Sequence, residues 1–228
     1  MKIVANESYI EKRIKMGEFL PLASLGLLGG SLALTYFKPE WTMVTMVMVL
    51  LGFFASIAGS YYVNRFNGNT PMFKEIPKLL KGLSDEYALL MYKLPAPFVL
   101  VGPGGLTAIK VKNQSGDIGF HEGRWHHAQR MKFLRQFGGE ESLGKPDEQA
   151  FTLAQDLEEY LAQRLPDDVT VPVQGIALFI NPAAQLDTAE SPVPVLWSKE
   201  LKGWLRNKGR RPALPKETRR VLTEALEI

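Results

Sequence analysis

The sequence predicts an α/β fold, in which a two-helix transmembrane hairpin precedes an α/β domain with a mixed, largely antiparallel central sheet. Two long segments without a charged residue, 19–37 and 41–63, predict the hairpin. Short β-prone segments alternate with turns over residues 87–124 and predict an antiparallel meander. The helical spacing of residues 146–165 and the continuous apolar run 173–181 predict a long helix and a strand buried on both faces.

The two uncharged segments hold 19 and 23 residues. A helix needs roughly 20 apolar residues, at about 1.5 Å rise each, to cross the hydrocarbon core of a bilayer. Only Lys38, Pro39 and Glu40 separate the segments, so the two helices must turn back on each other. The alternatives are a buried hairpin in a soluble core and a cleaved signal peptide. Neither segment keeps the polar face of a soluble helix, and the first is longer than the apolar region of a signal peptide.

The distribution of Lys and Arg predicts the orientation of the hairpin. Basic residues cluster before the first segment and after the second, whereas the connector holds only Lys38. Positively charged flanks stay in the cytoplasm, so we expect a cell-membrane protein with two spans and both termini cytoplasmic. No ionisable residue lies inside either segment, which argues against a proton relay or an ion path. The flanking basic residues are Lys2, Lys12, Arg13 and Lys15 before the hairpin and Arg65, Lys74, Lys78 and Lys81 after it.

Small residues recur at four-residue spacing in both segments, at Gly26 and Gly30 and at Gly52, Ser56 and Ser60. This spacing lets helices approach each other closely. We expect it to serve packing within the hairpin, while formation of an oligomer through these faces stays open.

The bounds of the two uncharged segments divide the 228 residues into four parts. Residues 1–16 are an amphipathic N-terminal segment, in which residues 6–16 form a short helix lying on the inner membrane surface. Residues 17–64 form the hairpin, residues 65–71 the linker and residues 72–228 the cytoplasmic domain. The length of this last part suits one globular domain.

Turn residues delimit the elements of the cytoplasmic domain. Pro103, Gly104 and Gly105 form a tight hairpin turn, and residues 113–116 form the next turn. The expected strands are 87–93, 98–102, 106–112, 117–120 and 173–181, and the expected helices are 71–83, 146–165, 199–208 and 215–227.

Residues 199–220 form a basic segment, although the net charge of the whole chain is only +3. The segment contains nine basic residues against Glu200 and Glu217. Three interpretations are open: contact with nucleic acid, contact with anionic lipid headgroups, or an ordinary solvated helix surface. The chain has no cysteine, which excludes disulfides and thiolate chemistry. The candidate contact residues for nucleic acid or lipid are Lys110, Lys112, Lys202, Arg206, Lys208, Arg210 and Arg211.

Two other patterns are not expected to be sites. Adjacent residues such as His126 and His127 would point to opposite faces if they lay on a strand. These two residues and His121 are therefore expected to be ordinary histidines rather than metal ligands. The glycine turn at 102–105 lacks the Gly-Lys-Ser/Thr ending of a phosphate loop and joins two strands rather than a strand and a helix.

Residues 98–118 (FVLVGPGGLTAIKVKNQSGDI) resemble the NERD domain, a nuclease-related domain of the restriction-endonuclease-like superfamily. The shared features are a strand ending in Val-Gly-Pro, a glycine turn, and a strand ending in Lys-Asn before a further glycine turn. The resemblance extends over most of residues 79–205 and implies a restriction-endonuclease-like α/β domain. In that superfamily an Asp and a Glu on adjacent strands hold a divalent cation, and a nearby Lys orients the water that attacks a phosphodiester.

The chain departs from that family at both carboxylate positions. Lys112 matches the family's Lys, but Lys110 stands where the Glu is expected and Pro97 where the Asp is expected. A lysine there also places a positive charge where the cation would bind. The resemblance therefore implies a retained fold with lost chemistry, with no catalytic residue, no metal and no cofactor. Mg²⁺ would be the cofactor only if other acids rebuilt the site, namely Asp117, Glu122, Glu75, Asp85 or Glu86.

Three functions follow from these expectations. The preferred one is a membrane-anchored, catalytically inactive nuclease-related domain that acts as a binding or assembly module for nucleic acid or protein at the cytoplasmic membrane face. The second is a metal-dependent nuclease that uses relocated acidic residues. The third is a structural subunit that assembles with another membrane protein through the hairpin.

Overall fold

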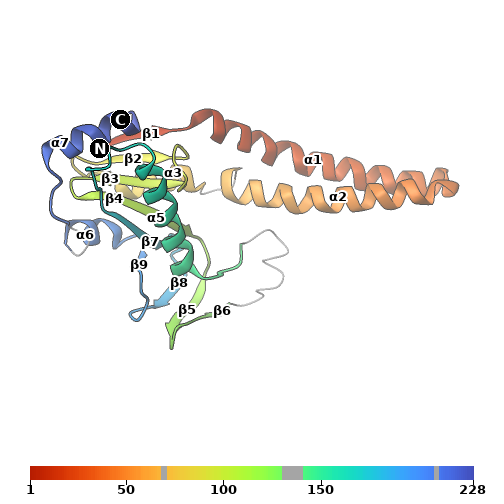
Figure 1. Cartoon of the computed structure of the whole chain (residues 1–228). Coiled ribbons are helices and arrows are strands. Elements are labelled where there is room, and N and C mark those ends of the chain that lie inside the picture. The colour runs from red at the N-terminus through yellow and green to blue at the C-terminus, as the bar shows by residue number, and fades with distance from the viewer. Residues whose placement is uncertain (68–70, 130–140, 208–210) are drawn as a thin grey trace. The chain divides into compact units, whose positions relative to one another are not determined.

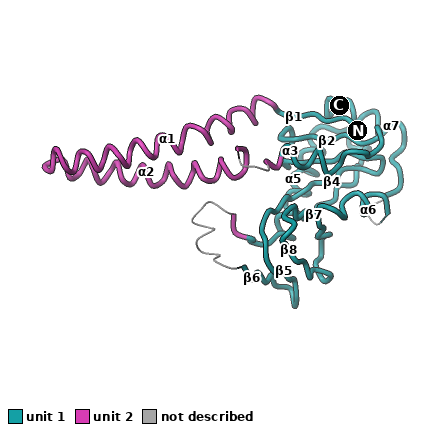
Figure 2. The backbone as a smooth tube through the Cα atoms, turned by 180° about the vertical axis from the view of Figure 1, so that it is seen from behind, with its two compact units in different colours: residues 1–6, 73–130, 143–228 teal, residues 7–72, 131–142 magenta. Residues whose placement is uncertain are grey.

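The structure, a computed structural model, describes residues 1–67, 71–129, 141–207 and 211–228. The chain forms two compact units (Figure 2). Unit 1 comprises residues 1–6, 73–130 and 143–228, and unit 2 comprises residues 7–72 and 131–142. Unit 1 is an α/β domain, and unit 2 is built on two long apolar helices (Figure 1).

The two helices of unit 2 are α1 (Glu7–Phe37) and α2 (Thr42–Tyr62), joined by the 3₁₀ turn Pro39–Trp41. A π-helical turn, Val63–Asn67, follows α2. By length and composition, two helical segments are able to cross a membrane, one being α1 and the other containing α2. The separate surface helix expected over residues 6–16 is not present, because α1 runs without a break from Glu7 through the first uncharged segment.

Helices α1 and α2 lie side by side and run in opposite directions (Figure 1). The hydroxyl of Ser24 on α1 donates a hydrogen bond of 2.8 Å to the carbonyl oxygen of Gly52 on α2. A Cβ atom on Gly59 would lie 3.0 Å from the ring of Pro21, and one on Gly52 would lie 2.9 Å from a leucine of α1. These glycines therefore serve close packing within the chain, as expected, whereas a Cβ on Gly26 would meet no atom within 4 Å.

The central sheet of unit 1 has six strands in the order β1-β2-β3-β4-β7-β9. The β1–β2, β4–β7 and β7–β9 pairs are parallel, and the β2–β3 and β3–β4 pairs are antiparallel. The sheet is mixed as expected, but the expectation that it is largely antiparallel is wrong, because β7 returns beside β4 through a crossover that contains α5. The strands are β1 (Lys2–Ala5), β2 (Ala88–Met91), β3 (Phe98–Gly102), β4 (Gly105–Lys112), β7 (Val173–Phe179) and β9 (Val195–Trp197).

A second sheet of three strands has the order β6-β5-β8. It contains β5 (Gly116–His121), β6 (Arg124–Ala128) and β8 (Ala184–Asp187). The single meander expected over residues 87–124 is therefore broken after β4, because β5 pairs with β6 and β8 instead of continuing the central sheet.

Helices α5 (Pro146–Ala162) and α7 (Lys216–Leu226) pack on the same face of the central sheet. Leu157 and Leu161 of α5 and Leu222 of α7 share one hydrophobic cluster with residues of β2, β3 and β4. On α5 itself, Ala150 is buried whereas its neighbour Phe151 is 56% exposed. The remaining helices are α3 (Met72–Leu80) and α6 (Leu201–Arg206), so all four helices expected in this part of the chain are present, with shorter bounds.

The first six residues belong to unit 1 rather than to the membrane segment, which differs from the expected 1–16 part. Strand β1 pairs in parallel with β2, and the backbone N–H of Asn6 donates to the carbonyl oxygen of Met91 at 2.9 Å. Strands β1, β6, β8 and β9 were not expected from the sequence. With three to five residues each, they are too short to show a clear alternating pattern.

Candidate functional site

Strand β4 carries Lys110 and Lys112 to the face of the central sheet that α5 covers. Leu106 and Ala108 of β4 belong to the cluster shared with α5, and alternate residues of a strand share a face. Lys110 is half-buried, and Lys112 is only 2% exposed. Neither lysine therefore lies on an open surface of the kind expected for contact with nucleic acid or lipid.

Lys112 connects the central sheet to the chain just before α5. Its Nζ donates a hydrogen bond of 2.7 Å to the carbonyl oxygen of Leu143. A hydrogen bond also connects the second sheet to the first turn of α5: the Nε1 of Trp125 donates to the Oδ1 of Asp147 at 2.7 Å. The ammonium group of Lys112 thus has a structural role in positioning the start of α5.

Pro97 and Lys110, which stand where the resembled family has carboxylates, lie next to and on neighbouring strands. Val99 of β3 pairs with Ala108 of β4, Pro97 directly precedes β3, and Lys110 lies two residues after Ala108. Neither side chain offers an oxygen ligand, and the lysine repels a cation. The residues present at this place therefore do not fit Mg²⁺.

The acids that could have rebuilt a metal site are dispersed. Asp117 lies in β5 of the second sheet and Glu122 in the turn that follows it, so neither belongs to the central sheet. The other three have their own cationic partners: Glu75 pairs with Lys78 at 2.7 Å, Asp85 with the amino group of Met1 at 2.6 Å, and Glu86 with Arg219 at 3.6 Å. Among the described residues, no group of three or more His, Asp or Glu side chains could hold a metal ion.

The three histidines lie on the second sheet. The Nε2 of His121 is 3.4 Å from the Oδ2 of Asp187, and the ring of His126 is centred 6.2 Å from that of His121. His127 instead has its Nε2 2.9 Å from the carbonyl oxygen of Ser115. His126 and His127 therefore have different neighbours.

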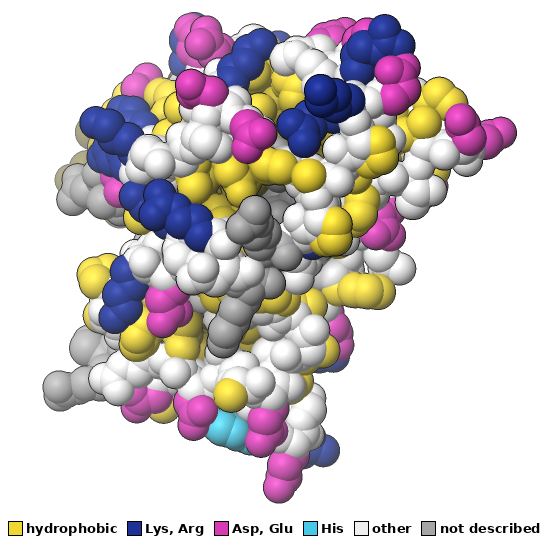
Figure 3. All heavy atoms as spheres, turned by 90° about the vertical axis from the view of Figure 1, so that its left-hand side faces the viewer, with side chains coloured by type: hydrophobic (Ala, Val, Ile, Leu, Met, Phe, Trp, Pro, Cys, Tyr) yellow, Lys and Arg dark blue, Asp and Glu magenta, His cyan; other side chains and the backbone are white. Residues whose placement is uncertain are grey.

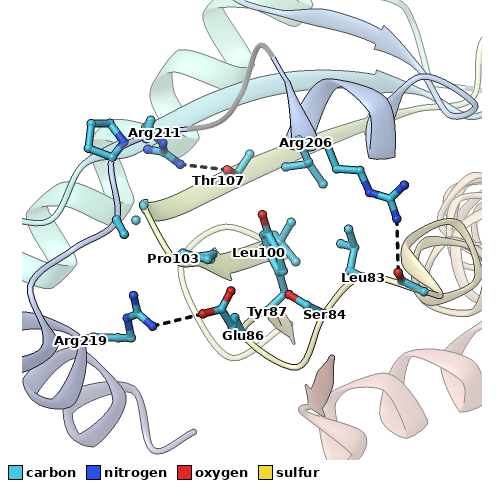
Figure 4. Close-up of a pocket in the computed structure, with 17 residues that line it drawn as sticks. Leu83, Ser84, Glu86, Tyr87, Leu100, Pro103, Thr107, Arg206, Arg211 and Arg219 are labelled. Carbon is cyan, nitrogen blue, oxygen red and sulfur yellow. Dashed lines mark hydrogen bonds and ion pairs between the residues drawn. The ribbon is translucent and has the colours of Figure 1, made fainter.

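The opposite face of β3 and β4 lines a cavity of about 820 Å³. Leu100 and Thr107, which alternate with the residues of the α5 face, lie in its wall together with Leu205 of α6 (Figure 4). Ligand pockets in proteins commonly enclose about 300–1,000 Å³. Figure 3 shows basic side chains beside hydrophobic ones on the side of unit 1 where α6 and α7 lie. This cavity is the candidate functional site.

The glycines that carry the family resemblance shape the cavity. A Cβ on Gly102 would lie 2.7 Å from the Cε1 of Tyr87, and one on Gly104 would lie 2.7 Å from the Cβ of Arg211. Gly105 has φ +119, and a Cβ there would lie 2.3 Å from the carbonyl oxygen of Pro172. The glycine turn thus lets Tyr87, Arg211 and Pro172 approach the end of the β3–β4 hairpin.

Arg211 is the most deeply set cation in the cavity wall. Its two terminal nitrogens donate to the carbonyl oxygens of Pro172 and Leu106, at 3.1 and 2.8 Å, and to the Oγ1 of Thr107 at 3.2 Å. Its Nε is buried without a hydrogen-bond partner. Burial lowers the pKa of Arg211 below its ordinary value, although a guanidinium keeps its proton in proteins. None of these acceptors is a carboxylate, so no direct ion pair with a described residue neutralises its positive charge.

Two further arginines, Arg206 of α6 and Arg219 of α7, line the same cavity. Arg206 makes a long hydrogen bond of 3.5 Å to the carbonyl oxygen of Gly82. Arg219 lies 3.6 Å from Glu86, and its Nε is buried without a partner. Arg219 was not among the candidate contact residues, although it lies in the basic segment from which they were taken.

The structure therefore separates the candidate contact residues. Arg206 and Arg211 line different parts of the cavity wall (Figure 4), whereas Lys110 and Lys112 lie on the other face of the sheet. Lys202 does not line the cavity, and its Nζ donates to the carbonyl oxygen of Lys81 at 2.9 Å. Lys208 and Arg210 are outside the described residues.

No family model, curated protein or solved structure matches this chain. What the structure defines is an α/β protein with a mixed sheet, long N-terminal apolar helices and a cavity lined by arginine.

Proposed function

We propose that this chain is a membrane-anchored binding module of the NERD kind. In this proposal α1 and α2 form a transmembrane hairpin, and unit 1 is a restriction-endonuclease-like domain without catalytic activity. The domain binds nucleic acid at the cytoplasmic face of the cell membrane.

The surface of unit 2 supports the membrane anchor. Large apolar side chains of α1 and α2 point outward, and Leu32, Tyr36 and Met43 are 75–81% exposed. Exposure of apolar surface to water costs about 25 cal/mol per Å², and lipid removes this cost. Basic residues on both outer flanks and a single lysine in the connector favour cytoplasmic termini.

The observation that supports the loss of catalysis is that Pro97 and Lys110 stand where the resembled family has carboxylates. Metal-assisted phosphodiester hydrolysis needs hard oxygen ligands to hold the cation and activate water. A proline and a lysine supply none, and the ammonium group of Lys112 is bonded to a backbone carbonyl. The positive charge of the arginine-lined cavity supports a polyanionic partner, because arginine and lysine bind nucleic acid through its phosphates.

A cleavage and binding assay tests this function. The full-length protein in detergent is incubated with labelled RNA, single-stranded DNA and duplex DNA, with Mg²⁺ or Mn²⁺. We expect binding that weakens as salt rises, and intact nucleic acid at every time point. Metal-dependent cleavage abolished by Lys112→Ala or Asp117→Asn would overturn the loss of catalysis, and absence of binding to every nucleic acid would overturn the partner.

The absence of cysteine makes the anchor directly testable, because any introduced cysteine is the chain's only thiol. A membrane-impermeant maleimide should label Lys38→Cys in intact cells and should not label Glu122→Cys until the cells are opened. The protein should also stay in the membrane pellet after alkaline carbonate extraction. The reverse labelling pattern, or release by carbonate, contradicts the proposed anchor.

A further inference from the structure

The cavity of unit 1 has cationic side chains on two opposite sides. Arg206 of α6 lies on one side, and Arg211 and Arg219 lie on the other (Figure 4). Among the described residues that line the cavity, Glu86 is the only acid, and it lies beside Arg219. A concave surface lined mainly by one sign of charge concentrates ions of the opposite sign. Because the positive charge is divided between two sides, the cavity suits an extended anion with charges along its length rather than a single anionic group.

Both sides of the cavity are open to solvent. Arg206 is exposed, and the side chain of Arg219 is 39% exposed, although Glu86 lies 3.6 Å from it. Arg211 is half-buried and held by three acceptors, so it adds a fixed charge to the side of Arg219. The cations among the described lining residues are all arginines, and a planar guanidinium is better suited than the ammonium of lysine to recognise phosphate. This charge pattern favours the phosphates of an extended chain.

The wall between the two sides offers an aromatic ring. Tyr87 lies between Arg206 and Arg219 in the close-up and is half-buried (Figure 4). Its ring packs against Gly102, where a Cβ would lie 2.7 Å from the Cε1 of the tyrosine. An aromatic ring is a stacking surface for any nucleobase, provided that the base is unpaired. A cavity of about 820 Å³ has the size of a small-molecule site, so it takes in an unpaired base but not a duplex.

We propose that a single strand of nucleic acid crosses this cavity, with one phosphate near Arg206, another near Arg219, and an unpaired base against Tyr87. This inference deepens the proposed function and rests on it, because it names the form of nucleic acid that is bound and the surface that binds it. That surface lies on the face of the sheet opposite to Lys110 and Lys112, so it is separate from the place where the resembled family has its catalytic residues.

The salt dependence of binding tests the two phosphate contacts. Fluorescence anisotropy on the full-length protein in detergent measures Kd for a short labelled oligonucleotide over a range of salt concentrations. For a single strand, each phosphate that a cation neutralises contributes about 0.7 to the slope of log Kd against log salt. Arg206→Gln and Arg219→Gln should each lower that slope by about 0.7 and weaken binding about 10-fold or more. The double variant should lose both contributions.

Two further variants make the test specific. Tyr87→Leu should weaken binding of the single strand about 5- to 100-fold and leave the salt slope unchanged, because stacking neutralises no phosphate. Arg220→Gln is the matched control, because Arg220 is adjacent to Arg219 in α7, pairs with Glu217 and does not line the cavity. The control should keep the slope and the affinity of the wild type. Thermal unfolding checks that every variant is folded.

Three competing probes separate the possible ligands. They are the same oligonucleotide annealed to its complement, adenosine monophosphate and a polyglutamate peptide of equal charge. We expect the single strand to bind most tightly, and adenosine monophosphate to bind weakly because one phosphate reaches only one side of the cavity. Equal affinity for the duplex or for polyglutamate, an equal effect of Arg220→Gln, or an unchanged slope in either cavity variant overturns the inference.

The same measurements distinguish this failure from that of the proposed function. If single strand or duplex binds and the cavity variants bind like the wild type, the cavity assignment is wrong and the nucleic-acid module stands. If no nucleic acid binds, the proposed function is wrong and the inference falls with it. Binding of polyglutamate alone, dependent on Arg206 and Arg219, would instead identify the cavity as a site for an acidic peptide.

Discussion

Replacement of Gly105 by alanine tests how the glycine turn builds the cavity. Gly105 has φ +119, which only glycine adopts without strain, and a Cβ there would lie 2.3 Å from the carbonyl oxygen of Pro172. That oxygen cannot move away cheaply, because it accepts hydrogen bonds from the backbone N–H of Leu106 at 2.9 Å and from Arg211 at 3.1 Å. Gly105→Ala should therefore strain the turn and disturb both hydrogen bonds.

Two terms add up to the expected destabilisation. A left-handed backbone costs a residue with a Cβ about 1–2 kcal/mol, and overpacking a tight site costs about 1–3 kcal/mol. The free energy of unfolding of unit 1 should thus fall by about 2–5 kcal/mol. For a domain of this size 1 kcal/mol corresponds to about 2–4 °C, so Tm should fall by about 4–20 °C.

Two other glycines separate these terms. Gly123 has φ +73 and no atom within 4 Å of a built Cβ, so Gly123→Ala carries the backbone term alone, about 1–2 kcal/mol. Gly175 has no left-handed φ, but its Cβ would lie 2.1 Å from the carbonyl oxygen of Ala150, so Gly175→Ala carries the contact term alone. Thermal unfolding of the full-length variants in detergent, followed by tryptophan fluorescence, measures all three. The reasoning is refuted if Gly105→Ala is no less stable than Gly123→Ala.

Three further predictions use the same preparation. Lys112→Ala should lower the free energy of unfolding of unit 1 by about 2–5 kcal/mol, because it leaves a cavity and a carbonyl oxygen without its donor. Lys110 is only half-buried, so Lys110→Ala should cost about 1 kcal/mol or less. Equal losses would contradict the structural role of Lys112. Trp125→Phe should cost about 1.5–3 kcal/mol in the same unfolding measurement through loss of its bond to a carboxylate, and an unchanged Tm would count against that bond. Gly52→Leu should separate α1 from α2 and lower the temperature at which the protein aggregates in detergent, whereas Gly26→Leu should leave that temperature unchanged. Altered migration of Gly26→Leu on a sizing column would instead indicate that this residue faces a second copy of the chain.

Local patterns predicted the elements that carry their own signal. The uncharged segments became α1 and α2, the amphipathic spacing of residues 146–165 became α5, and the proline-glycine turn became the β3–β4 hairpin. Patterns failed where an element is defined by a distant partner. Strand β1 has four residues and is a strand only because it pairs with residues 88–91, and β5 leaves the meander because its partners are β6 and β8.

The candidate site shows the same division. The basic segment could be recognised from charge alone, but charge could not show which of its residues line the cavity. Arg206, Arg211 and Arg219 line one cavity because α6, the chain before α7, and α7 all border it. Lys110 and Lys112 are excluded from this group because even-numbered residues of β4 face α5, while Thr107 faces the cavity.

By itself the sequence determined what depends on neighbouring residues: two helices long and apolar enough for a membrane, a mixed α/β domain, and a lysine and a proline where the resembled family has carboxylates. Only the tertiary structure decided which strands pair in parallel, that Lys112 is buried against a backbone carbonyl, and that three arginines share one cavity. The physical reason is that helical periodicity and turn chemistry act over a few residues. Strand pairing, burial and the lining of a cavity instead depend on contacts between distant segments, such as that between Arg211 and Leu106, which are 105 residues apart.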